Sequence, residues 1–421
     1  LGLAPLPNID FNIKCGNTLV GYATEKELDD ALAYGDMFAN DEFKEKISTE
    51  MQVVATAYSC FRSEQLKVYD DNASIKATKE MLKGRLTTLN DLLNRHMHQS
   101  VASGSDYDQW LRNTQPFHWL AEFYQIIHGN GGFDVIIGNP PYVEHSSNSF
   151  NYRLAHLVSA ECGNLYGNCI ERGLTIGSND GKFSFIIPVA ITCSKRMDKV
   201  IAMLKTESQS LLFANFDDRP GKLFEMIEHL RATIFIASRS KNQERTKIFA
   251  TKYNRWYTEH RGLLFKNLCY AQVDEFVDSF IIPKFSYSVE CTINEKLLGC
   301  KSTISSTYAS MGNRKVYYRA AGGGYFLLIK NQKSITYIDG NLEDVKAEKS
   351  ITIDSVYSNT AIGALLSSSL FYWNYIGYTD CRNLTKSFID NFNFVESIGN
   401  DVLLIESGDK LFENYEVTKC T

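Results

Sequence analysis

The sequence predicts an α/β protein with a doubly wound sheet, a helical insertion and a mixed α/β C-terminal domain. Strands and helices alternate over residues 116–240, as in sheets with helices on both faces. Residues 24–112 lack proline and are rich in Glu, Lys, Asp and Leu, which predicts helices. After about residue 283, Ser, Thr, Tyr and Gly become frequent and short alternating segments predict strands.

The first 22 residues are expected to form a strand and a turn. Ile9, Phe11 and Ile13 alternate with polar residues, and the turn at 15–17 ends the pattern. In the helical stretch that follows, two to four helices are expected. Its clearest signal is a leucine stripe on one helical face, and a partner-binding coiled coil is the alternative interpretation. The stripe consists of Leu82, Leu86, Leu89 and Leu93.

The continuous apolar run Phe133–Gly138 predicts a central parallel strand that is buried on both faces. A helix over 160–176 and a second buried strand over 183–188 are expected to follow. The remaining expected elements are a helix over 195–205 and strands over 211–216 and 232–237, the last of which closes the set. In the C-terminal third, Lys315–Arg319 predicts a short strand.

Composition narrows the class of protein. Hydrophobic residues make up 44% and charged residues 22% of the chain, and no apolar run is long enough to span a bilayer, so we expect a cytoplasmic protein without membrane contact. The ten cysteines show no paired metal-ligand spacing, so no metal site is predicted. The net charge is −5, but residues 284–395 hold 12 Lys and Arg against 9 Asp and Glu, which favours nucleic-acid binding there.

The motif with the clearest chemistry is Asn139-Pro140-Pro141-Tyr142, directly after the predicted strand. Ligands of open α/β sheets bind at the carboxyl ends of strands. Two prolines fix two φ angles and remove two N–H donors, so the loop presents the Asn139 side-chain oxygen and a backbone carbonyl, that of Pro140, as acceptors. These acceptors suit the two N–H groups of an adenine amine, and Tyr142 offers a face for stacking an extruded base.

On these residues the chain resembles the adenine-specific (N6) DNA methyltransferases of type IIG-like restriction–modification and phage-defence systems. The resemblance covers nearly the whole chain, as the catalytic half plus the target-recognition domain. It implies a partial Rossmann-like methyltransferase sheet, S-adenosylmethionine as cofactor and double-stranded DNA as partner. The supporting segments are Pro7–Asp10, Ile13–Leu19, Pro116–Trp119, Gly163–Tyr166 with Glu171-Arg172, Gly181–Pro188 and Phe216–Phe224.

The resemblance also implies roles for single residues. Gly16, Asn17 and Asn139 would contact S-adenosylmethionine, and Phe224 would pack against the flipped base opposite Tyr142. An ordinary core aromatic is the alternative for Phe224. The candidates for DNA contact, mainly through phosphates, are Arg219, Lys222, Arg314, Lys315, Arg319, Arg382 and Lys386.

The implied domain division has four parts: residues 1–22 (methyltransferase, first segment), 23–115 (helical insertion), 116–282 (catalytic segment) and 283–421 (target recognition). The Phe-x-Gly-x-Gly cofactor loop of the family is not found in the sequence, and the chain starts without methionine. We therefore expect an N-terminal portion of the same polypeptide to carry that loop and any nuclease domain. By itself the fragment is expected to be inactive and to bind S-adenosylmethionine weakly or not at all.

Other functions share parts of this pattern. The same loop chemistry suits methylation of cytosine N4, of RNA adenine or of a protein glutamine amide, although the cytosine enzymes usually carry Ser where this chain has Asn139. A DNA specificity subunit that retains an inactive methylase scaffold is the non-enzymatic alternative.

Overall fold

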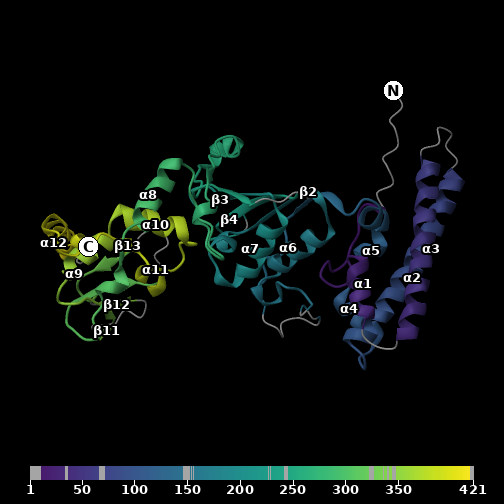
Figure 1. The fold of residues 1–421 in the computed structure, drawn as a ribbon, viewed down its shortest axis with the longest axis horizontal. Coiled ribbons are helices and arrows are strands. Elements are labelled where there is room, and N and C mark those ends of the chain that lie inside the picture. The colour runs from purple at the N-terminus through teal and green to yellow at the C-terminus, as the bar shows by residue number, and fades with distance from the viewer. Residues whose placement is uncertain are drawn as a thin grey trace. The chain divides into compact units, whose positions relative to one another are not determined.

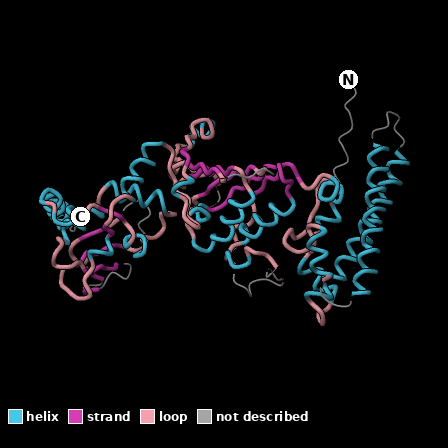
Figure 2. The backbone as a smooth tube through the Cα atoms, viewed as in Figure 1, coloured by secondary structure: helices cyan, strands magenta, loops and turns pink. Residues whose placement is uncertain are grey.

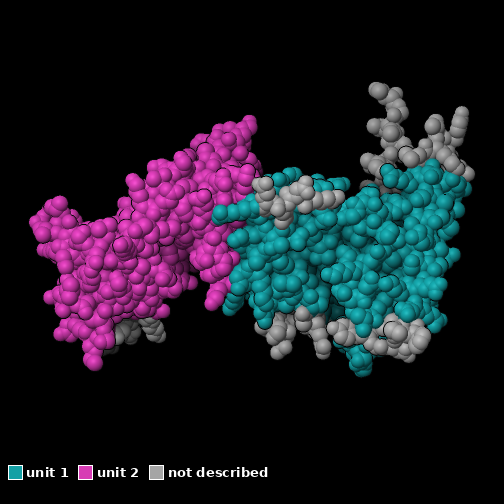
Figure 3. All heavy atoms as spheres, viewed as in Figure 1, with its two compact units in different colours: residues 1–187, 196–211, 235–246 teal, residues 188–195, 212–234, 247–421 magenta. Residues whose placement is uncertain are grey.

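The computed structural model describes residues 11–33, 37–65, 72–145, 152, 154, 156–225, 227, 229–240, 245–321, 327–334, 336–338, 341–343 and 348–417. The chain divides into two compact units (Figure 3). Unit 1 comprises residues 1–187, 196–211 and 235–246, and unit 2 comprises residues 188–195, 212–234 and 247–421. The segment Pro7–Asp10 and the residue Ile9 lie outside the described residues.

The proline-free stretch forms four helices, the upper end of the predicted number (Figure 1). They are α1 (Glu25–Leu32), α2 (Met37–Gln65), α3 (Asn72–Val101) and α4 (Tyr107–Thr114). Thr24 caps the N-terminus of α1: its side chain accepts from the Glu27 amide, and Glu27 Oε2 accepts from the Ala23 amide at 2.8 Å. The long helices α2 and α3 pack against each other.

The leucine stripe forms the core between these helices, as predicted. Leu82, Leu89 and Leu93 are fully buried and Leu86 is nearly so. They share a cluster with residues from both flanking segments, among them Phe11 and Leu120. The helical stretch therefore has a common core with the segments before and after it.

The strand expected around Phe11 and Ile13 was wrong for its described part. Residues 11–13 form a turn, with Phe11 packed edge-to-face on Phe61 and Ile13 exposed to solvent. The alternation misled because it spans too few residues to distinguish a strand from a turn that buries one aromatic side chain.

A six-stranded sheet follows, in the order β1-β2-β4-β3-β5-β6. Its strands are β1 (Phe133–Gly138), β2 (Gly177–Pro188), β3 (Ser210–Phe216), β4 (Ala232–Ser238), β5 (Lys247–Ala250) and β6 (Ala271–Gln272). The associated helices are α5 (Trp119–Glu122), α6 (Leu165–Ile176) and α7 (Asp198–Glu207). Apart from α5, β5 and β6, which the sequence did not predict, these elements overlap the predicted ones, although β2 begins at Gly177 and not at residue 183.

The strand β1 runs parallel to β2, as predicted, with Gly138 opposite Phe185. It is an edge strand, however, and not a central one. Val135 is 59% and Ile137 is 79% exposed, so in the described part of the chain nothing covers that face. A continuous apolar run indicates that both faces are suited to burial, but it does not say which neighbours are present.

The sheet is mixed, because β6 pairs antiparallel with β5 and places Phe249 opposite Gln272. The expectation that the strand over 232–237 is the last strand of the sheet was wrong, because β5 and β6 follow it in the chain. Each added strand is four residues or shorter, which is too short to produce a periodic signal.

The C-terminal third, all in unit 2, has its own core, which includes Val316, Ile362 and Phe371. Its helices are α8 (Ser288–Leu298), α9 (Asn359–Leu366), α10 (Ser369–Tyr378), α11 (Lys386–Asp390) and α12 (Val402–Val417). Its strands are β7 (Ser302–Thr303), β8 (Lys315–Arg319), β9 (Ile329–Lys330), β10 (Thr336–Ile338), β11 (Asn341–Glu343), β12 (Glu348–Thr352) and β13 (Asn393–Phe394). The predicted strand is β8, between β12 and β9.

Figure 2 shows the helical N-terminal region, the strand-rich middle and the mixed C-terminal region in turn. The division into four domains stays a prediction. Within the described ranges, none of the helices has the length and apolar character that crossing a membrane requires.

Candidate active site

The loop Asn139–Tyr142 begins directly after the last residue of β1, at the carboxyl end of the strand. Gly138 is required there, because a Cβ atom at this position would lie 2.6 Å from the ring of Phe185 on β2. In the loop itself, Pro140 is buried while Asn139 is exposed. The proline therefore anchors the loop, and the asparagine side chain remains accessible to a ligand.

Tyr142 is half-buried, and its hydroxyl is held at the sheet end. It donates to Asn139 Oδ1 at 2.7 Å or to the Ile186 carbonyl at 2.8 Å. Burial raises the pKa of Tyr142 to about 12, so the hydroxyl keeps its proton and acts as a donor. An amide oxygen has two lone pairs, so Asn139 Oδ1 can still accept from an incoming N–H group. The hydroxyl thus fixes which amide atom faces a substrate.

The chain after Tyr142 is fastened to the N-terminus of α6. The Leu165 amide donates to the Val143 carbonyl at 3.0 Å, and the His145 amide donates to the Gly163 carbonyl at 3.0 Å. The His145 ring also contacts Asn168 Oδ1 at 2.9 Å. The segment 163–166, which the resemblance identifies as the helix after the catalytic loop, therefore lies beside the loop.

The two segments that flank the helical stretch lie side by side. The Asn17 amide donates to the Gln115 carbonyl at 2.7 Å, and the Phe117 amide donates to the Val20 carbonyl at 2.7 Å. Gly21 adopts φ +133°, and a Cβ atom there would lie 2.2 Å from the Phe117 carbonyl oxygen. Only glycine permits this approach, which holds the segment containing Asn17 against its neighbour.

Asn17, to which the resemblance assigns a contact with S-adenosylmethionine, has its side chain held by two hydrogen bonds. Its side-chain oxygen accepts from the Leu19 amide at 3.1 Å, and its side chain also bonds the hydroxyl of Tyr152. An amide and a tyrosine side chain suit an adenine ring, which offers both polar edges and a flat surface. Gly16 next to it is exposed. In the described part of the chain, Asn17 bonds the Gln115 carbonyl and Asn139 bonds the Tyr142 hydroxyl.

Sequence reasoning missed a buried ion pair beneath this segment. The Arg172 side chain is almost completely buried, and its Nη1 lies 2.6 Å from Glu27 Oε1. His118 is fully buried nearby, where Nδ1 accepts from the Tyr22 amide at 3.0 Å and Nε2 meets Asn94 Oδ1 at 3.0 Å. The spacing of Thr24 and Glu27 at a helix start was a signal for Glu27, but its partner Arg172 is 145 residues away and could not be read from the sequence.

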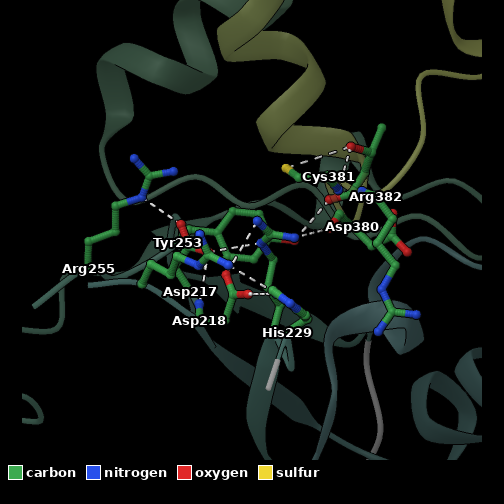
Figure 4. A network of polar contacts seen from close by, with 11 residues as sticks. Asp217, Asp218, His229, Tyr253, Arg255, Asp380, Cys381 and Arg382 are labelled. Atoms are coloured by element: carbon green, nitrogen blue, oxygen red, sulfur yellow. Dashed lines mark hydrogen bonds and ion pairs between the residues drawn. The ribbon is translucent and has the colours of Figure 1, made fainter. Parts of the chain in front are cut away.

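In unit 2, the segment Phe216–Phe224 begins with two buried carboxylates (Figure 4). Asp217 accepts from Arg231 Nε at 2.9 Å and from Arg255 Nε at 2.6 Å. Asp218 lies 3.4 Å from Arg231 Nη2. The network compensates the buried charges and fixes the start of the segment, a role that the sequence did not indicate. Phe224 at its other end is half-buried.

The same network reaches the loop after α10. Arg231 Nη1 donates to the Asp380 carbonyl at 3.3 Å, and the Tyr253 hydroxyl donates to the Thr379 carbonyl at 3.0 Å. The Arg382 amide donates to Asp380 Oδ1 at 3.0 Å, and its side chain is exposed. The loop that carries Arg382 is therefore attached to the carboxyl end of β3.

The other DNA-contact candidates differ in how their charges are engaged. Arg219, which is exposed, donates to His229 Nδ1 at 3.3 Å, and Lys222 is half-buried. On β8, Lys315 is half-buried and Arg319 is exposed. Arg314 is also exposed.

Arg314 Nη1 donates to the carbonyls of Ser355 and Tyr357 at 2.8 and 3.2 Å. Lys386 pairs with Asp390 at 2.9 Å and lies over the Tyr308 ring, so part of its charge is compensated. The DNA-binding roles of these residues stay predictions, as does the pairing of Phe224 with Tyr142.

Comparison with known proteins gives two sequence findings. Residues 39–221 match the family model described as Eco57I restriction-modification methylase. A protein of Methanocaldococcus jannaschii, described as a type II restriction enzyme and methyltransferase, is 24% identical over 251 residues, which are 50% of this chain and 21% of that protein. The chain thus spans about a fifth of the length of this curated relative. These findings confirm the resemblance at the level of the family.

Among solved structures, the type IIL restriction-modification enzyme MmeI in complex with DNA is similar at 11% identity and a TM-score of 0.32, covering 71% of this chain and 52% of that one. The DrdV–DNA complex is similar at 14% identity and a TM-score of 0.30, covering 45% of this chain and 23% of that one.

Proposed function

We propose that this chain, whose residues 39–221 belong to the Eco57I restriction-modification methylase family, is the catalytic part of an adenine-N6 DNA methyltransferase. It would transfer a methyl group from S-adenosylmethionine to a flipped adenine at a specific site in double-stranded DNA. The observation that carries the proposal is the loop Asn139–Tyr142 at the carboxyl end of β1, with an accessible asparagine oxygen that Tyr142 orients.

The chemistry follows from the two N–H groups of the adenine amine. Asn139 Oδ1 and the Pro140 carbonyl accept these hydrogens, which turns the nitrogen towards a tetrahedral geometry and directs its lone pair at the methyl group. S-adenosylmethionine supplies the electrophilic methyl group when it is bound. Tyr142 stays protonated, so its contribution is to orient Asn139 and to offer its ring to the base.

Asn17 and Tyr152 would hold the adenine ring of the cofactor, with the exposed Gly16 beside them and Asn139 at the reacting end. The glycine loop of the family lies in another portion of the polypeptide in this proposal. The uncovered face of β1, with Val135 and Ile137 exposed, supports the view that further chain packs there. Without the glycine loop, we expect the isolated chain to be inactive.

Double-stranded DNA would contact the C-terminal third and the segment Phe216–Phe224. Residues 283–421 would form the target-recognition domain. The exposed guanidinium groups of Arg219, Arg314, Arg319 and Arg382 would meet phosphates. Such an enzyme works in the cytoplasm, on cellular DNA.

The test is to incubate the complete natural protein with S-adenosylmethionine and DNA, and to analyse the digested nucleosides by mass spectrometry. We expect N6-methyladenine. Methylated cytosine would show that the amine is a different one, and methyl transfer to RNA or protein but not to DNA would overturn the proposed substrate. DNA binding without any methyl transfer would favour the inactive scaffold.

A further inference from the structure

Three large apolar side chains are exposed in the short stretch 257–265, between β5 and β6. Tyr257 is 61%, Leu263 is 48% and Phe265 is 62% exposed. We call these three side chains the apolar ridge. The segment that carries them projects as a short coil near the β3 label in Figure 1. Isolated exposed apolar residues are common on protein surfaces, but a close group of them marks an interaction site.

The ridge is held in place from below. Trp256 and Leu264, each next to a ridge residue in the sequence, are buried against Phe216 at the end of β3. The rings of Trp256 and Phe216 meet edge-to-face at 5.9 Å. The inward side chains therefore fix the outward ones, and the exposure of the ridge is a consequence of the fold and not of a frayed end.

The ridge is also bonded to the segment that carries Phe224. Arg261 Nη1 donates to the Lys222 carbonyl at 2.8 Å, and Nη2 donates to the Leu223 carbonyl at 2.9 Å. The Gly221 amide donates to the Trp256 carbonyl at 2.7 Å. The ridge thus lies next to the segment of unit 2 that ends in Phe224, the residue proposed to pack against the flipped base.

The charge around the ridge is positive. Residues 252–266 contain four cations and one carboxylate, a local charge of +3 in a chain of −5. Arg255 shares its charge with Asp217, while the Arg261 guanidinium bonds backbone carbonyls, which do not neutralise it. Lys252 and Lys266 are exposed. Apolar side chains among cations are complementary to DNA, where phosphates flank the faces of the bases.

We propose that the apolar ridge is a wedge that packs against double-stranded DNA at the step from which the target base is extruded. Extrusion unstacks the neighbouring bases, and rigid apolar side chains compensate by contacting the faces that become exposed. The inference rests on the proposed function and adds to it a surface that promotes extrusion.

The test uses the complete natural protein and a DNA duplex that contains the site which the protein methylates, with 2-aminopurine in place of the target adenine. The variant Tyr257→Ser/Leu263→Ser removes two exposed ridge side chains. Phe265→Ser is a second variant, because Phe265 touches the Phe216 ring. The control is Leu403→Ser on α12, where the side chain is 73% exposed. Lys266→Ala measures the charge contribution through the salt dependence of binding.

We expect the double variant to weaken duplex binding about tenfold or more and to lower the 2-aminopurine fluorescence of the complex. Leu403→Ser should remain within about twofold of the wild type, and Lys266→Ala should reduce the slope of log K against log salt by about 1. Wild-type affinity and fluorescence in both ridge variants would overturn the proposal, and so would a change in oligomeric state alone, which would mean that protein covers the ridge. A wild-type protein that does not bind DNA would instead overturn the proposed function.

Discussion

Replacing Tyr142 with phenylalanine removes one hydroxyl group and keeps the ring at the end of the sheet. The hydroxyl lies 2.7 Å from Asn139 Oδ1 and 2.8 Å from the Ile186 carbonyl. Because one hydroxyl proton is donated to one of these acceptors at a time, the variant loses the equivalent of one hydrogen bond. Such a bond contributes about 0.5–1.5 kcal/mol net. If that energy orients the amide in the transition state, kcat should fall about two- to twelvefold.

The assay is single-turnover methyl transfer from labelled S-adenosylmethionine to site-containing DNA, with DNA affinity measured in parallel. Tyr357→Phe is a matched control, because that half-buried tyrosine donates its hydroxyl to Glu396 in the C-terminal third of the chain. We expect its rate and DNA affinity to match the wild type, and the DNA affinity of Tyr142→Phe to be unchanged.

Two results would contradict this role of the Tyr142 hydroxyl. An unchanged rate would show that the hydroxyl does not orient Asn139. A loss of more than a hundredfold together with a changed pH–rate profile would indicate that the hydroxyl transfers a proton. Because burial raises the pKa of Tyr142 to about 12, the rate between pH 7 and 9 should show no step that Tyr142→Phe abolishes.

Three further predictions concern activity and stability. Asn139→Ala should abolish methyl transfer while DNA affinity stays within about twofold, and surviving methylation would mean that the amine is held in another way. Burial lowers the pKa of His118 to about 3, so the unfolded state binds its proton more tightly and stability is lost as the pH falls below about 6.5. Urea unfolding at pH 5 should show a loss of ~2 kcal/mol that His118→Gln lacks, and equal losses in both proteins would contradict this. Gly21→Ala should destabilise unit 1 by ~2–3 kcal/mol through its clash with Phe117, whereas Gly84→Ala, in open space on α3, should stabilise it slightly; similar thermal shifts for both would exclude the clash.

Local periodicity accounts for the parts of the fold that could be predicted. The stripe from Leu82 to Leu93 repeats over three helical turns, so it specified both the helix and its buried face. The strand β1 was recognised by its apolar run, but its place at the sheet edge depends on which other strands are present. No local pattern contains that information, and the same holds for the two-residue strand β6.

In the site, too, the sequence predicted what consecutive residues determine and missed the contacts between residues that lie far apart in the chain. The loop Asn139–Tyr142 could be recognised because its chemistry resides in four consecutive residues. The bond between Tyr142 and Asn139 needed the structure, because it depends on how the loop turns back on itself. The network of Asp217, Arg231 and Arg255 joins residues that follow β3, precede β4 and follow β5, and the sequence indicates none of those pairings.

The most direct test is a structure of the complete natural protein bound to its DNA site and a non-reactive analogue of S-adenosylmethionine. We predict that the exocyclic nitrogen of an extruded adenine lies within hydrogen-bond distance of both Asn139 Oδ1 and the Pro140 carbonyl, with the ring of Tyr142 against the base. A target base held elsewhere, or an amine nitrogen that contacts neither acceptor, would contradict the account.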